Sequence, residues 1–185
     1  MAESKVVSIP FSSHFVLSKS QCPKIEGEMI KMSYVLYPNV IGAIMYAMIS
    51  TRHDLSFAIS MLSRFMSNLG SEHWTALKWV LRYINSSLCV GLEYYKRNAS
   101  LDLVGFVDSD FIGDRDTRKS TTSYYFTLGG NYISRKSQLH PIIALSSTEA
   151  KYMAIADVFK EVVWLQGLMT EAHLADGKVT IHSNS

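Results

Sequence analysis

The residues VGFVDSDFIGD, at positions 104–114, place three aspartates within seven positions directly after an apolar, strand-like stretch. Carboxylates that converge from separate elements can hold two divalent metal ions about 4 Å apart, an arrangement that cuts phosphodiester bonds. Asp108 at the end of a strand and Glu149 at the start of a helix lie 41 positions apart and would come from different elements. This pair is therefore a candidate for metal-assisted chemistry.

A purely structural role explains the same carboxylates. Ser146 and Glu149 have the spacing of a capping box, in which the glutamate side chain binds a backbone N–H at a helix start. Asp110, Asp114 and Asp116 suit turns, because an aspartate side chain accepts hydrogen bonds from nearby backbone. Spacing alone favours this structural interpretation over the metal site.

Basic and aromatic residues accompany these carboxylates. Arg118 and Lys119 lie in one loop, and Arg135 and Lys136 lie in a neighbouring strand. Three tyrosines are interleaved with them: Tyr124, Tyr125 and Tyr132. Cations and aromatic rings along one sheet edge suit a phosphate backbone, so these four basic residues are the candidate nucleic-acid contacts. A solvated basic loop beside acidic residues is an equally ordinary surface.

Composition narrows the possible classes of protein. Of the 185 residues, 48% are hydrophobic and 18% are charged, which is typical of a globular chain with a core. The net charge of +2 is too small to indicate nucleic-acid binding by itself. The six histidines form no H-x-x-x-H pair, and the chain has no Gly-rich phosphate loop or G-x-S-x-G elbow. Cys22 and Cys89 fit no metal spacing and are expected to be free thiols.

The N-terminal residues contain no apolar signal segment, and the longest apolar run, at positions 40–49, is too short to span a bilayer. We therefore expect an intracellular chain, in the cytoplasm or the nucleus, without a membrane partner.

The elements that must position these residues fall into two parts, of which the first is helical. Residues 1–38 hold three of the four prolines and show little periodicity, which predicts an irregular arm. Apolar spacing then predicts three helices, over positions 40–50, 55–66 and 72–85. Thr51 and Asp54 have the spacing of a cap for the second of these, and Ser71 is the expected cap of the third.

After about residue 86 the pattern becomes that of a sheet. We predict strands over 88–95 and 101–108, a hairpin over 120–137, a helix over 148–170 and a strand over 178–182. The fold class is therefore α+β or mixed α/β, with helices followed by β-β-β-β-α-β. If the strands that end at Asp108 and near Asn184 are parallel neighbours, their carboxyl ends share one rim, where open α/β sheets tend to bind ligands.

Long stretches of the chain resemble a known family. Residues 39–84, from NVIGAIMY to LRYI, resemble the segment that closes the reverse transcriptase of copia-type LTR retrotransposon Pol polyproteins. Residues 103–169, which include DSDFIGD and SSTEAKY, resemble the RNase H domain that follows it. The resemblance implies an arm (1–38), the helical end of the reverse-transcriptase region (39–86) and an RNase H-like mixed sheet with packed helices (87–185).

The resemblance also implies residue roles. The family's first metal-binding aspartate ends the first strand, at Asp108, and its glutamate begins the first helix, at Glu149. The next aspartate ends the fourth strand, where this chain has Asn184, and Asp110 would be an outer helper. The family uses Mg²⁺ or Mn²⁺ to hydrolyse RNA–DNA hybrids.

Departures from the family pattern predict a loss of activity. Asparagine offers a metal one neutral carbonyl oxygen where aspartate offers two anionic ones, and octahedral Mg²⁺ tolerates that poorly. Lys151 replaces a second acidic residue beside Glu149, and the fourth family carboxylate lies beyond Ser185. We therefore expect weak or lost metal binding and no useful RNase H activity. The polymerase aspartates belong to an earlier part of the polyprotein, so polymerase activity is not expected.

Three hypotheses remain open at this point. The chain is a decayed remnant without catalysis, whose exposed last strand makes the fold poorly cooperative or prone to aggregation. Alternatively, it is a ribonuclease module whose missing carboxylates come from another chain, such as the rest of a Pol polyprotein. In the third hypothesis it is a domesticated, effector-like protein that binds an RNA–DNA hybrid or other nucleic acid without cutting it.

Overall fold

The computed structural model describes residues 5–96, 101–174 and 178–183, and it has the mixed α/β class expected from the sequence. The chain divides into two compact units, Met1–Leu92 and Glu93–Ser185, which we describe separately. The boundary between them falls a few residues after the predicted end of the helical region. The further division of the chain into an arm, a reverse-transcriptase end and an RNase H-like domain stays a prediction.

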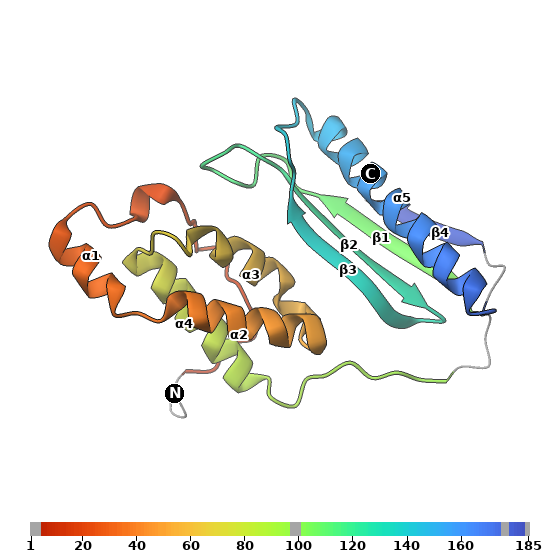
Figure 1. Cartoon of the computed structure of the whole chain (residues 1–185), viewed down its shortest axis with the longest axis horizontal. Helices are drawn as coiled ribbons and strands as arrows, with labels where there is room; N and C mark the ends of the chain where they lie inside the picture. Colours follow the sequence, from red (N-terminus) through yellow and green to blue (C-terminus); the bar gives the residue numbers. More distant parts are fainter. Residues whose placement is uncertain (1–4, 97–100, 175–177, 184–185) are drawn as a thin grey trace. The chain divides into compact units, whose positions relative to one another are not determined.

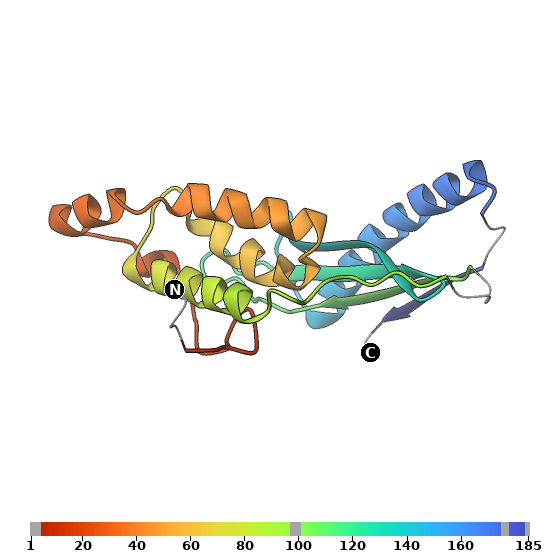
Figure 2. The same cartoon turned by 90° about the horizontal axis from the view of Figure 1, so that it is seen from below.

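The first unit is helical (Figures 1 and 2). Its α-helices are α1 (Glu26–Ser33), α2 (Tyr37–Ser50), α3 (Ser56–Leu62) and α4 (Ser71–Ser86). Short 3-10 turns precede or connect them: η1 (Lys19–Gln21), η2 (His53–Leu55) and η3 (Ser63–Phe65). The three predicted helices thus form as α2, α3 with its η3 extension, and α4. Their apolar faces meet in one core, whose fully buried side chains include Tyr37, Ile41, Leu55, Leu62 and Leu77.

The predicted irregular arm is partly wrong, because residues 26–33 form α1. No residue of α1 is buried, so the helix lacks the strong apolar periodicity that would have revealed it. Apart from η1, the residues before it are irregular, but they pack onto α4. The indole N–H of Trp79 donates to the carbonyl of Ile9 (3.0 Å), and a His73 ring nitrogen lies 3.1 Å from the carbonyl of Ser18.

The predicted helix caps are also corrected by the structure. Thr51 ends α2, and Asp54 lies in η2, where its carboxylate pairs with Arg52 (2.8 Å) and caps no helix. The N-cap of α4 is Gly70, one residue before the expected Ser71, and its backbone N–H donates to Nδ1 of His73 (3.0 Å). A Cβ atom at Gly70 would overlap the carbonyl oxygen of Gln21, so this position requires glycine.

The second unit is a four-stranded sheet in the order β3-β2-β1-β4. Its strands are β1 (Leu103–Ser109), β2 (Thr121–Leu128), β3 (Asn131–Leu139) and β4 (Val179–Ser183). β1 pairs antiparallel with β2 and parallel with β4, and the parallel register ends at Val107 opposite Ser183. The β2–β3 hairpin turns at Gly129 and Gly130, whose φ angles of 55° and 83° suit the turn predicted there.

The long helix α5 (Ser147–Glu171) connects β3 to β4 and covers one face of the sheet (Figure 1). Small and apolar side chains at a spacing of three or four residues face the sheet: Ala150, Ala154, Val158, Val162, Leu165 and Met169. They pack on Leu103, Val107 and Phe126 of the sheet. The chain after β3 is therefore a crossover that returns a parallel strand beside β1, as expected.

The predicted strand over residues 88–95 is wrong, because this segment has no strand pairing. Its backbone forms hydrogen bonds with a side chain and not with a neighbouring strand. The backbone N–H and carbonyl of Tyr95 bind the side-chain amide of Asn131 (2.8 and 2.9 Å). Leu88 and Val90 are largely exposed, so no face of the segment is buried. As a result, β1 is the first strand of the sheet and β4 is the fourth.

Within the described residues, no single helix has the length and apolar character needed to cross a membrane. The α1–α2 pair, bent by 45°, satisfies that test only when the two helices are taken together.

Candidate functional site

One rim of the sheet gathers the segments that carry the predicted site. β1 ends at this rim, and so does β4, because the two strands are parallel neighbours. β3 runs in the same direction as β1, so the chain leaves β3 at this rim and enters α5 there. Figure 1 shows the arrowhead of β1 and the first turn of α5 at the same end of the sheet. The topology therefore brings Asp108 and Glu149 to one rim, as their positions in the sequence predicted.

Asp108 lies near the end of β1, on the face of the sheet opposite α5. Its side chain is exposed, and Oδ1 accepts a hydrogen bond from the backbone N–H of Ser109 (2.8 Å). The next position of the predicted set, Asn184, lies outside the described residues. Ser183, just before it, is the register partner of Val107. The described part of the rim thus offers one exposed carboxylate from β1.

Glu149 has the capping role that its spacing suggested. Ser146 is the N-cap of α5, and its hydroxyl oxygen accepts the backbone N–H of Glu149 (3.1 Å). Oε2 of Glu149 accepts the backbone N–H of Leu145 (2.6 Å), one residue before the usual partner in a capping box. This carboxylate therefore stabilises the start of α5, and a metal ion would compete with that hydrogen bond.

The remaining aspartates fix the loop between β1 and β2. Asp110 accepts the backbone N–H of Thr121, and a Cβ atom at Gly113 would overlap the Asp110 carboxylate. Asp114 is buried, and its carboxylate accepts both the backbone N–H and the hydroxyl of Thr117. These contacts fit the turn interpretation of both aspartates.

The carboxylates that the structure describes near the rim do not gather into one cluster. Among residues 5–96, 101–174 and 178–183, no three His, Cys, Asp or Glu side chains gather closely enough to hold a metal ion. Two divalent ions need several anionic oxygens that bridge and flank them. Asp108, Glu149 and Asp110 each accept a backbone N–H instead, from Ser109, Leu145 and Thr121.

The four basic residues that were predicted to contact nucleic acid do not share one environment. Lys136 faces α5, where its Nζ lies 3.5 Å from the carboxylate of Asp157. Burial by itself would raise the pKa of Asp157, but Lys160 and Lys136 outweigh it and hold that pKa below its usual range. Arg135, the next residue along β3, points to the opposite face because strand side chains alternate.

Lys119 and Arg118, in the loop between β1 and β2, also have different surroundings. Lys119 donates from Nζ to the carbonyl of Pro141 (2.6 Å), whereas the exposed Arg118 has a left-handed backbone with φ of 57°. The four cations therefore do not form a single stripe, and their role in binding stays a prediction.

Sequence reasoning missed a column of stacked rings on the face opposite α5. Phe106 in β1 stacks on Tyr125 in β2 (centroids 4.8 Å apart) and on His182 in β4 (5.0 Å). Tyr125 stacks in turn on Tyr132 in β3 (5.3 Å), so the column crosses all four strands. The rings cover one another's faces and mainly stabilise the sheet. Only the strand register, which periodicity does not give, could have revealed this column.

A buried histidine near the rim was also missed. His140 is 4% exposed, and its Nε2 lies 2.6 Å from the hydroxyl of Thr122, while Nδ1 is buried without a hydrogen-bond partner. Burial lowers the pKa of His140, and the charges of Asp110 and Asp157 oppose that effect only in part. The ring is therefore held neutral and structural.

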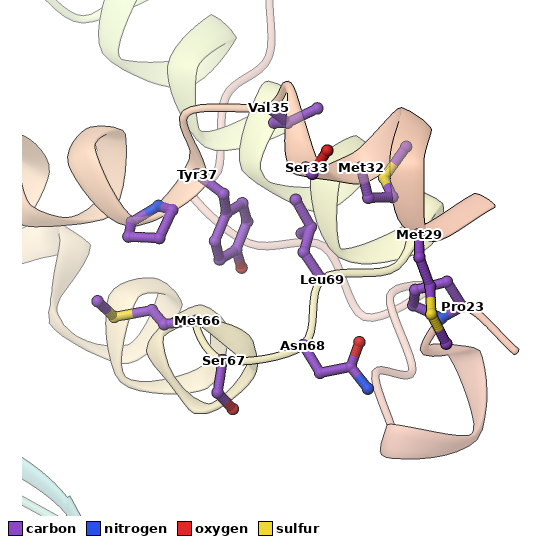
Figure 3. Close-up of a pocket in the computed structure, with 11 residues that line it drawn as sticks. Pro23, Met29, Met32, Ser33, Val35, Tyr37, Met66, Ser67, Asn68 and Leu69 are labelled. Atoms are coloured by element: carbon purple, nitrogen blue, oxygen red, sulfur yellow. The ribbon is translucent and has the colours of Figure 1, made fainter. Parts of the chain in front are cut away.

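A separate cavity of about 300 Å³ lies in the first unit, between α1, the start of α2 and the turn before α4 (Figure 3). Its lining is mostly apolar and includes Met29, Met32, Tyr37, Met66 and Leu69. None of the sequence-predicted site residues lines it.

Comparison with known proteins identifies relatives of the chain. The whole chain is 40% identical, over 189 aligned residues, to the retrovirus-related Pol polyprotein from transposon TNT 1-94 of Nicotiana tabacum, and it spans 14% of that protein. It is 37% identical over 135 residues to the Pol polyprotein from transposon RE2 of Arabidopsis thaliana, of which the match covers 9%.

A shorter relative matches over almost its full length. The secreted RxLR effector protein 161 of Plasmopara viticola is 46% identical over 134 residues, which are 72% of this chain and 94% of the effector. No family model matches the chain, and no solved structure matches it. The sequence similarity shows that the chain is homologous to a short segment of retrovirus-related Pol polyproteins from transposons.

Proposed function

We propose that this Pol-derived segment joins the end of a reverse transcriptase to the first part of an RNase H-like domain, and that it does not hydrolyse RNA–DNA hybrids. The second unit would be the RNase H-like part, and the helical first unit would be the end of the reverse-transcriptase region. The chain spans about one seventh of the tobacco polyprotein that it matches, so the activities of that whole protein are part of this proposal.

The observation that carries the proposal is the placement of Asp108 and Glu149 at one rim. The order of elements is β-β-β-α-β, with β1 and β4 as parallel neighbours. In the family that the sequence resembles, metal ligands lie at the end of the first strand, the start of the first helix and the end of the fourth strand. Without the rejected strand at 88–95, these places correspond to Asp108, Glu149 and position 184.

The lack of activity follows from the donor atoms. Asn184 stands where the family has an aspartate, and its amide offers one neutral oxygen and two N–H donors. The Glu149 carboxylate already accepts the N–H of Leu145. Asp108 likewise accepts the N–H of Ser109, so each carboxylate near the rim already has a backbone donor.

The effector-like alternative has less support. A nucleic-acid surface built from Arg118, Lys119, Arg135 and Lys136 would need these cations on one face. Lys136 instead pairs with Asp157 beneath α5, and Arg135 points to the other face of the sheet.

The test uses the purified chain with an RNA–DNA hybrid that carries a label on the RNA strand, in the presence of Mg²⁺ or Mn²⁺. We expect no cleavage above that of the Asp108→Asn variant, and no metal binding at millimolar concentration by calorimetry. Metal-dependent cleavage that Asp108→Asn abolishes would overturn the proposal. Cleavage that survives this substitution would indicate a contaminating nuclease, and the assay would be repeated after further purification.

A further inference from the structure

We draw no further inference here: the strongest candidate, the exposed apolar side chains of Phe111, Ile142, Ile143 and Leu145 in the two loops that the Lys119–Pro141 hydrogen bond joins at the rim of the sheet, carries nothing because nothing in the described residues shows what covers them.

Discussion

The guanidinium of Arg52 forms a double hydrogen bond to the carboxylate of Asp54, with Nε–Oδ1 and Nη2–Oδ2 distances of 3.1 and 2.8 Å. The same guanidinium donates to the carbonyl and the hydroxyl of Ser87 (3.2 and 2.7 Å), and Tyr83 donates to Asp54 (2.7 Å). These contacts tie the turn between α2 and α3 to the end of α4. The arrangement explains why Asp54 does not cap a helix.

This network predicts that Asp54→Asn destabilises the first unit in a pH-dependent way. Burial alone would raise the pKa of Asp54, but the hydrogen bonds from Arg52 and Tyr83 outweigh it and hold the pKa below its usual range. A carboxyl group with a lowered pKa stabilises the fold at pH values above about 4, and the contribution is lost as pH falls through the folded-state pKa. We expect a cost of about 1–3 kcal/mol at pH 7.

The cost should shrink as the pH falls from 5 towards 3. Urea unfolding followed by tryptophan fluorescence in a Trp164→Phe background reports on the first unit, because the other tryptophans, Trp74 and Trp79, lie in α4. Asp116→Asn, at an exposed loop position in the second unit, is the matched control. A pH-independent cost would contradict the role assigned to the ion pair.

Gly70→Ala should destabilise the first unit, whereas Gly42→Ala should stabilise it. A Cβ atom at Gly70 would overlap the backbone of Gln21, which cannot move aside as a flexible side chain could, so we expect a loss of about 2 kcal/mol. A Cβ atom at Gly42, inside α2, meets no atom within 4 Å, and alanine gains up to about 1 kcal/mol in a helix. Urea unfolding of both variants gives the comparison, and equal effects would refute it.

The sequence predicts the elements that have strong periodicity and fails where structure depends on distant contacts. The alternation around Phe106 and Val107 and the apolar spacing of α5 identify both elements, and the positions of Asp108 and Glu149 at their ends place them at one rim. The segment at 88–95 has similar apolar content, but no strand pairs with it, and strand character needs pairing as much as propensity.

Three other features could not be predicted from the local sequence. The helix α1 buries none of its residues, so its pattern carries no signal. The need for glycine at position 70 comes from Gln21, which is distant in sequence, and the stacked rings of Phe106 and His182 depend on the parallel register of β1 and β4. At the candidate site, the sequence identifies which carboxylates approach the rim, but not that backbone N–H groups already bind Asp108, Asp110 and Glu149.

Because the His140 ring is buried, we expect the free energy of unfolding of the second unit to fall under mildly acidic conditions. The pKa of His140 is lowered, mainly by burial, so between the folded-state pKa and the unfolded value near 6.5 the unfolded chain binds more protons. The stabilisation is therefore complete above about pH 6.5 and is lost as pH falls through the folded-state pKa.

Hydrogen exchange of peptides from β2 and β3 at several pH values measures this effect. His140→Gln cannot titrate, and its exchange-derived stability should change less between pH 7 and pH 5 than that of wild type. His173→Gln, at an exposed position just after α5, should keep the wild-type slope. If His140→Gln retains the full wild-type slope, another group is responsible.

Asn184→Asp should strengthen metal binding at the rim. Position 184 follows Ser183, whose register partner is Val107, the residue before Asp108. A carboxylate at position 184 would add two anionic oxygens where asparagine offers one neutral oxygen, and Mn²⁺ prefers anionic oxygen ligands. We expect Mn²⁺ affinity to rise at least tenfold over wild type in a calorimetric titration. Asn184→Ser controls for loss of the amide, and Asp108→Asn added to Asn184→Asp should remove the gain. If Asn184→Asp folds normally but binds Mn²⁺ no better than wild type, then β4 does not deliver position 184 to the rim beside Asp108.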